Sequence, residues 1–186
     1  DISSSKDAKS LKVKFLKVAG LGTPDKSKVL NVYLDQHKLL WIATIKGLQI
    51  YNLKNKQLDA TGLAFSTTKV FDRNNAIDKI VYSPFRESIY ETVEDEVGNI
   101  WLAGDAGLYM FDNKKRDFLF YKLGGWVKTI SISHNRNGEK EVWAGSFSNG
   151  LMILNIVTNK LEVIEYDNFS NLGVLNGLVH KIYKGS

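Results

Sequence analysis

The sequence predicts an all-β chain in which short antiparallel strands form four-stranded units, and three observations support this class. Glycine, asparagine and aspartate separate short apolar runs along most of the 186 residues. No stretch of about 12 residues shows the periodicity of an amphipathic helix. A motif that places one tryptophan between two turns occurs three times. Hairpins that follow one another are therefore the expected architecture.

Composition indicates an ordinary globular chain. Its residues are 44% apolar and 24% charged, and residues 1–9 form a polar tail without a visible export signal. No apolar run approaches the roughly 18 residues of a membrane helix, so this segment is expected to make no membrane contact itself. The chain contains no cysteine, which excludes disulfides, thiolate metal ligands and cysteine nucleophiles.

The net charge of +5 is concentrated near the N-terminus. Residues 1–28 carry seven lysines against three aspartates, whereas the remaining chain holds 18 basic and 17 acidic residues. Only four of the basic residues are arginine, the side chain favoured for phosphate and base contacts. A nucleic-acid-binding protein is expected to carry a basic stripe across its folded part. No nucleic-acid partner is therefore predicted.

The repeated motif sets a tryptophan between an acidic or polar turn and a glycine. In the best copy, Asp95 precedes Trp101 by six positions and Gly107 follows it by six. Residues 33–52 show the same spacings, and residues 135–155 repeat the tryptophan half with one extra residue before the glycine. The repeat residues are Trp41, Trp101, Trp143, Gly47, Gly107 and Gly150. We expect these tryptophans to pack between neighbouring units and these glycines to form tight turns.

The spacing of the motif favours a β-propeller segment of four-stranded antiparallel blades. The tryptophans are 60 and then 42 residues apart, and a period near 42 is typical of one blade. Three complete units are predicted, at about 29–59, 88–123 and 127–166. An insertion at 60–86 separates the first two, and partial blade strands are expected at 10–18 and 177–184, so the segment covers residues 10–184. Because propellers have four to eight blades, further blades of the same protein or another chain should complete it.

The second unit illustrates the expected strands. They lie at 88–94, 99–104, 107–112 and 117–123. Apolar and polar residues alternate in the first, whereas the middle two are apolar on both sides, as is typical of strands buried between neighbours. The connecting turns contain the Gly, Asn and Asp residues that tight turns favour.

At these residues the chain resembles the two-component regulator propeller repeat. "DEVGNIWLAGDAGLYMFD" matches the pattern of that repeat closely, and "DQHKLLWIATIKGLQIYN" matches it apart from the early glycine. The resemblance implies the periplasmic sensor part of a hybrid two-component protein, in which a membrane helix and a histidine kinase follow the propellers. It also implies an oligosaccharide ligand, a homodimer in the full sensor and no enzymatic activity in this segment.

A ligand site is expected where the turns between second and third strands meet the junctions between units. Trp126 lies at such a junction, outside the repeat tryptophan position, and is either a platform for a sugar ring or a packing residue. The insertion could lie over the same face or support dimerisation. The candidate ligand-binding residues are Trp126, Lys46, Asp105, Phe147, Asn149 and Arg73.

Other site chemistry is not supported by the sequence. The acidic run at 91–96 is too short for a calcium loop and is interpreted as a solvated hairpin turn. His37, His134 and His180 lie in different units, without a second histidine at metal-binding spacing. No metal, cofactor or catalytic residue is therefore predicted.

Three functions remain open. A ligand-sensing propeller is preferred because of the family resemblance. The alternative is a propeller that binds proteins and no sugar. A propeller lyase or hydrolase is less favoured, because it would need carboxylates, histidines or a metal to converge on one face.

Overall fold

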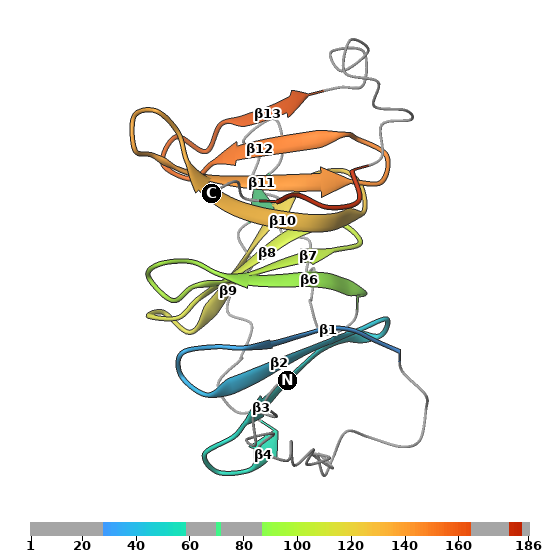
Figure 1. Cartoon of the computed structure of the whole chain (residues 1–186), viewed down its shortest axis with the longest axis vertical. Coiled ribbons are helices and arrows are strands. Elements are labelled where there is room, and N and C mark those ends of the chain that lie inside the picture. The colour runs from blue at the N-terminus through green and yellow to red at the C-terminus, as the bar shows by residue number, and fades with distance from the viewer. Residues whose placement is uncertain (1–27, 59–69, 72–86, 165–178, 184–186) are drawn as a thin grey trace, which may run out of the picture.

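Three β-sheets lie one above another along the long axis of the molecule (Figure 1). The computed structural model describes residues 28–58, 70–71, 87–164 and 179–183, and every regular element within them is a strand. The predicted all-β class is thus confirmed for the described part of the chain.

Each sheet is a meander of strands that follow one another along the chain. The first contains, in spatial order, β1 (Val29–Leu34), β2 (Leu39–Thr44), β3 (Gly47–Asn52) and β4 (Gln57–Leu58). The third contains β10 (Val127–His134), β11 (Lys140–Ser146), β12 (Leu151–Asn155) and β13 (Leu161–Ile164). The second contains β6 (Ile89–Glu94), β7 (Ile100–Gly104), β8 (Gly107–Asp112) and β9 (Asp117–Lys122). These last four strands match the predicted ones to within one residue at each end.

The second sheet has a fifth strand that the sequence did not predict. β5 (Val70–Phe71) comes from the predicted insertion and pairs in parallel with the outer edge of β9. An edge strand carries unpaired backbone groups, and a short segment that passes alongside can bond to them. The expectation of four strands per unit is therefore wrong for this sheet.

Two repeat tryptophans fill the spaces between the sheets. Trp41 is fully buried between the first and second sheets, where its ring centroid lies 5.3 Å from that of Phe111. Trp101 is fully buried between the second and third sheets and lies 5.6 Å from Tyr121. Each tryptophan therefore packs its own sheet onto the next one along the chain.

Trp143 occupies the corresponding position in the third sheet but is only partly buried. Its neighbours Val142 and Ala144 belong to the core between the second and third sheets. Because side chains alternate across a strand, Trp143 points to the other side of the third sheet. No described strand covers that side.

The six-residue spacing between aspartate and tryptophan has a direct structural cause. Oδ1 of Asp35 accepts the backbone N–H groups of His37 and Leu39, which closes the β1–β2 turn. Oδ2 of Asp35 accepts the indole N–H of Trp41 at 2.9 Å. Asp95 makes the equivalent bonds in the second sheet, with the Trp101 indole at 3.3 Å. One carboxylate thus shapes the turn and satisfies a buried indole.

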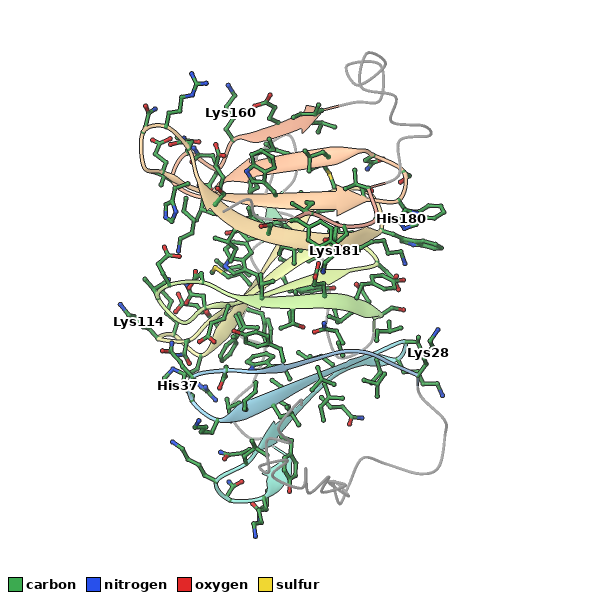
Figure 2. The ribbon with its side chains drawn as sticks, viewed as in Figure 1. Lys28, His37, Lys114, Lys160, His180 and Lys181 are labelled. Atoms are coloured by element: carbon green, nitrogen blue, oxygen red, sulfur yellow. The ribbon has the colours of Figure 1, made fainter. Side chains whose placement is uncertain are left out.

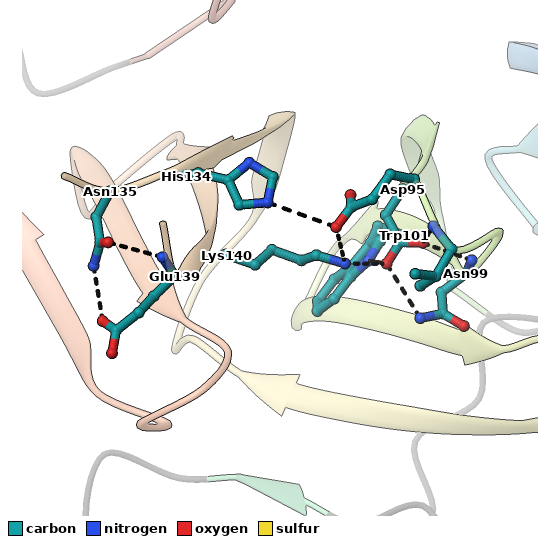
Figure 3. A network of polar contacts seen from close by, with 9 residues as sticks. Asp95, Asn99, Trp101, His134, Asn135, Glu139 and Lys140 are labelled. Atoms are coloured by element: carbon teal, nitrogen blue, oxygen red, sulfur yellow. Dashed lines mark hydrogen bonds and ion pairs between the residues drawn. The ribbon is translucent and has the colours of Figure 1, made fainter. Parts of the chain in front are cut away.

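The turns of the second and third sheets are joined by a polar network (Figure 3). Lys140 Nζ lies 3.0 Å from Asp95 Oδ2 and 2.8 Å from Glu96 Oε1. His134 Nε2 lies 3.6 Å from the same Glu96 oxygen. Asp95 is only 7% exposed, so the interpretation of residues 91–96 as a fully solvated turn is wrong at this residue. The indole, the amides and Lys140 together replace the water that this carboxylate loses.

Residues 179–183 lie beside the third sheet but form no strand. The Ile182 N–H donates to Oγ1 of Thr129 in β10, as the Ile130 N–H of β10 donates to Glu91 of β6. Lys181 forms an ion pair with Glu91. The strand predicted over 177–184 is therefore absent from its described residues, which make isolated bonds instead of a ladder: the Val179 N–H donates to the Ser146 carbonyl at 3.2 Å, and the Ile182 N–H donates to a side chain. The strand predicted at 10–18 lies outside the described residues.

Candidate functional site

Most of the candidate residues lie at one end of the strands, on the same side of all three sheets. We call this side the junction face. It is formed by the β2–β3, β7–β8 and β11–β12 turns and by the residues that lead into β1, β6 and β10. Figure 2 shows Lys28 and His180 at this end, and His37, Lys114 and Lys160 at the opposite end. The hydrogen bond from Ser88 Oγ to the Ile45 carbonyl joins the first and second sheets on this face.

Backbone geometry places an aromatic pair on the junction face of the third sheet. The Phe147 N–H donates to the Trp126 carbonyl at 2.9 Å, and the Ile45 N–H donates to Lys28 in the same way in the first sheet. The Trp126 and Phe147 rings are tilted by 48° and their centroids lie 5.7 Å apart. Each side chain is 51% exposed. Two large apolar rings are thus held side by side and open to solvent.

Asn149 fixes the backbone next to this aromatic pair. Its Nδ2 donates to the carbonyls of Leu123 and Gly124 at 3.2 Å each, which fixes the link that leads to Trp126. Its backbone N–H donates to Oγ of Ser146 at the end of β11. With both amide donors committed to the backbone, Asn149 positions the aromatic pair rather than offering those donors to a ligand.

A β-bulge occurs at the same place in the first strand of each sheet. The register shifts between Val29 and Asn31 in β1, between Ile89 and Glu91 in β6, and between Val127 and Thr129 in β10. The extra residues are Leu30, Tyr90 and Lys128. Bulges re-aim side chains next to binding sites. Here they bring Tyr90 and Lys128 of adjacent sheets together.

Tyr90 and Lys128 connect the acidic candidate to the aromatic pair. Asp105 Oδ1 accepts the Tyr90 hydroxyl at 2.5 Å, and Asp105 Oδ2 accepts the Ser88 N–H at 3.2 Å. Lys128 Nζ lies 3.2 Å from the centroid of the Tyr90 ring and 5.0 Å from that of Trp126. A continuous row therefore runs from Asp105 through Tyr90 and Lys128 to Trp126 and Phe147.

Burial and mutual interactions shift the pKa values of ionisable groups in and beside this row. Burial and the bond to Asp105 raise the pKa of Tyr90 to about 12. Burial lowers the pKa of Lys128, which the charge of Asp105 partly opposes. Burial raises the pKa of Glu87, although the Tyr109 hydroxyl, which donates to Glu87 at 2.6 Å, acts to lower it. Burial thus favours the neutral forms of Tyr90, Lys128 and Glu87.

The structure brings four of the six candidate residues together: Trp126, Phe147, Asn149 and Asp105. Lys46 lies in the β2–β3 turn, where its N–H donates to Oγ1 of Thr44. Arg73 lies outside the described residues. Sequence reasoning missed Tyr90 and Lys128, although both stand two positions after the residue that leads into the first strand. An alignment of the units on that residue could have found them.

The described residues offer no metal site and no membrane-spanning helix. No group of three or more His, Asp or Glu side chains within them could hold a metal ion. The three histidines, too, belong to different places in the fold, with His37 near Asn113 and His134 near Glu96. Nor does the described part of the chain contain a helix long and apolar enough to cross a membrane.

Three solved structures that superpose on the chain are extracellular domains of bacterial signalling systems. No protein-family model matches the chain, and a comparison with curated proteins finds no match. The chain superposes with a TM-score of 0.56 on the extracellular domain of the hybrid two-component system BT3049 from B. thetaiotaomicron, at 22% identity over 84% of this chain. It superposes with a TM-score of 0.60 on the extracellular domain of BT4673 from the same organism, described as a one-component system, at 16% identity over 90% of this chain. The likeness shows the fold.

These neighbours are the class of protein that the repeat motif resembles. A second structure of BT4673, described as a hybrid two-component system, gives a TM-score of 0.57 at 16% identity over 84% of this chain. The resemblance stated from the sequence is therefore confirmed at the level of fold. The chain spans 18%, 20% and 19% of the length of these three domains.

Proposed function

We propose that the three sheets are consecutive blades of a β-propeller in an extracytoplasmic, periplasmic sensor, and that the junction face binds an oligosaccharide. The observation that carries the proposal is the half-exposed pair of Trp126 and Phe147, fixed by backbone bonds and flanked by Lys128. The fold shared with extracellular signalling domains supports the sensor role.

The aromatic pair suits a sugar better than a flat protein contact. Sugar rings present apolar C–H faces that stack on aromatic rings, while their hydroxyls need polar partners at the edge of the platform. Trp126 and Phe147 provide two tilted rings, and Asp105, Tyr90 and Lys128 provide polar atoms within the same row. A site of this kind needs no catalytic group, in keeping with a sensor rather than an enzyme.

Completion of the fold is part of the proposal. Trp41 and Trp101 each pack against the next sheet, whereas Trp143 faces a side that no described strand covers. We infer that a further blade of the same protein packs on Trp143. In the complete sensor, a homodimer would pass the signal to a histidine kinase, and the ligand would shift it only by binding one arrangement more tightly than the other.

A glycan array followed by calorimetry tests the proposed ligand class. We expect the protein to bind at least one oligosaccharide on the array and Trp126→Ala to weaken that binding about tenfold or more. Val157→Ala is the matched control, because Val157 is 64% exposed in the β12–β13 turn away from the junction face. Silence on the array, together with capture of a protein partner that depends on Trp126, would favour the protein-binding alternative.

A further inference from the structure

Lys128 is a basic side chain held among aromatic rings on the junction face. Its ammonium contacts the Tyr90 ring and lies 5.0 Å from the centroid of Trp126. Lys140 and Lys181 form ion pairs with carboxylates, but within the described part of the chain Lys128 forms none. An ammonium group has three N–H donors, so donors remain for a ligand.

The carboxylates nearest to this row are already engaged. Both oxygens of Asp105 accept hydrogen bonds, one from Tyr90 and one from Ser88. Glu87 accepts the hydroxyl of Tyr109. The charge of Asp105 acts on Lys128, but the described residues show no ion pair between the two. Nearby carboxylates thus partly offset the positive charge of Lys128, but none of the described ones forms an ion pair with it.

The position of Lys128 relative to the platform is fixed by the fold. Trp126 stands two residues before it, and the β10 bulge aims Lys128 toward the neighbouring sheet. The Trp126 carbonyl accepts the Phe147 N–H, which fixes the platform beside the start of the strand that carries Lys128. A sugar ring stacked on Trp126 therefore places its substituents near Lys128.

We propose that the oligosaccharide recognised on the junction face is anionic, and that Lys128 pairs with its carboxylate or sulfate group. This inference rests on the proposed function. A hydroxyl of a neutral sugar on Trp126 would accept a hydrogen bond from Lys128 but would carry no charge to balance it, and a charge that loses water without a counter-charge costs free energy. An acidic group at that place replaces the lost water with a charge-assisted hydrogen bond. Lys128 is therefore the residue that makes the site prefer an anionic oligosaccharide to a neutral one.

Matched pairs of glycans test the proposal on the purified protein. The probes are an oligogalacturonate with its methyl ester, and a sulfated chondroitin oligosaccharide with its desulfated form. We expect one acidic member to bind about tenfold or more tightly than the form in which its own acidic group is masked, and to lose affinity as salt rises. Lys128→Gln should remove the preference, and Lys128→Arg should keep it because the charge remains. Lys160→Gln, an exposed lysine at the opposite end, is the control.

The outcomes distinguish an anionic ligand from an oligosaccharide site without a preference for charge. An advantage of the carboxylate pair identifies a uronic ligand, and an advantage of the sulfate pair identifies a sulfated one. Equal binding of acidic and masked forms, or a preference that survives Lys128→Gln, would overturn the charged ligand and leave the oligosaccharide site intact. Failure of the protein to bind any neutral, carboxylated or sulfated glycan on an array would overturn the proposed function as well.

Discussion

Tyr90 and Lys128 meet across the second and third sheets, with the Lys128 ammonium 3.2 Å from the centroid of the Tyr90 ring. Each residue is the extra residue of a β-bulge at the start of its sheet. The Tyr90 hydroxyl donates to Asp105 and thereby orients the ring that Lys128 contacts. Repetition of one backbone irregularity in adjacent sheets thus assembles a polar and aromatic site from residues 38 positions apart.

The ionisation of Tyr90 is the first testable consequence. Its pKa is raised to about 12, so its contribution to stability is complete below the usual tyrosine value of 10.0 and is lost as pH rises through about 12. Tyr33 and Tyr121 also have pKa values raised to about 12, so Tyr90→Phe should remove only part of the phenolate absorbance that develops above about pH 11 and leave the change near pH 10 intact. Loss of amplitude near pH 10 would show that Tyr90 is not held in this environment.

The network around Lys140 makes the packing of the sheets sensitive to acid. Burial acts to raise the pKa of Asp95, but hydrogen bonds from Lys140, the Asn99 N–H and the Trp101 indole leave it below its usual 3.8. A lowered carboxyl pKa stabilises the fold above about pH 4, and that stability is lost as pH falls further. The free energy of unfolding should therefore decrease between pH 7 and pH 3.

Replacement of Lys140 measures how much its contact with Asp95 contributes to the free energy of unfolding. Lys140→Met leaves the Asp95 carboxylate without its cation and should lower the free energy of unfolding at pH 7 by about 2–3 kcal/mol, with a smaller effect at pH 3. Lys115→Met should cost less than about 0.5 kcal/mol, because Lys115 is 70% exposed in its pair with Asp112. Urea denaturation at both pH values measures this, and equal losses for the two variants would contradict the network.

Gly107 is expected to tolerate no side chain. Its φ is +152°, and a Cβ atom there would lie 2.1 Å from the Tyr121 carbonyl oxygen. Gly107→Ala should therefore lower the free energy of unfolding by about 3 kcal/mol or more. Gly138 also has a positive φ but has nothing within 4 Å of that position, so Gly138→Ala should cost only about 1 kcal/mol. Similar thermal midpoints for both variants would argue against the tight contact of Gly107 with β9.

Trp143 tests whether a further blade covers the third sheet. If it does, Trp143→Ala in the complete protein should cost about 3–5 kcal/mol, as Trp101→Ala should, because both would leave cavities between sheets. A cost below about 1 kcal/mol for Trp143→Ala alone would mean that its ring remains in solvent. Chemical denaturation of the two variants distinguishes these cases.

Much of the sheet structure could be predicted from local patterns, because turn residues and alternation are local properties. For that reason, the predicted bounds of the four strands between residues 88 and 123 are accurate. β5 could not be predicted, since two residues carry no periodicity and their pairing with β9 spans about 50 positions. Trp143 shares its motif with Trp101, so only the stacking of sheets reveals that Trp101 is fully buried and Trp143 only partly.

The candidate site was predictable in part. Trp126 and Phe147 were found because turns and junctions between units lie at one end of a meander. Tyr90 and Lys128 meet through bulges, and a bulge shows in a sequence only when the units are aligned residue by residue. The role of Asp95 was misjudged because an acidic run in a turn predicts solvation, whereas here its indole and lysine partners come from β7 and β11.

The measurement that tests the central claim most directly is a crystal structure of the protein with its tightest array glycan bound. The account predicts a sugar ring stacked on Trp126 or Phe147, with an acidic group within hydrogen-bonding distance of Lys128 Nζ. A glycan bound at the opposite end of the sheets, beside the Asp35 and Asp95 turns, with the junction face left to solvent, would contradict it.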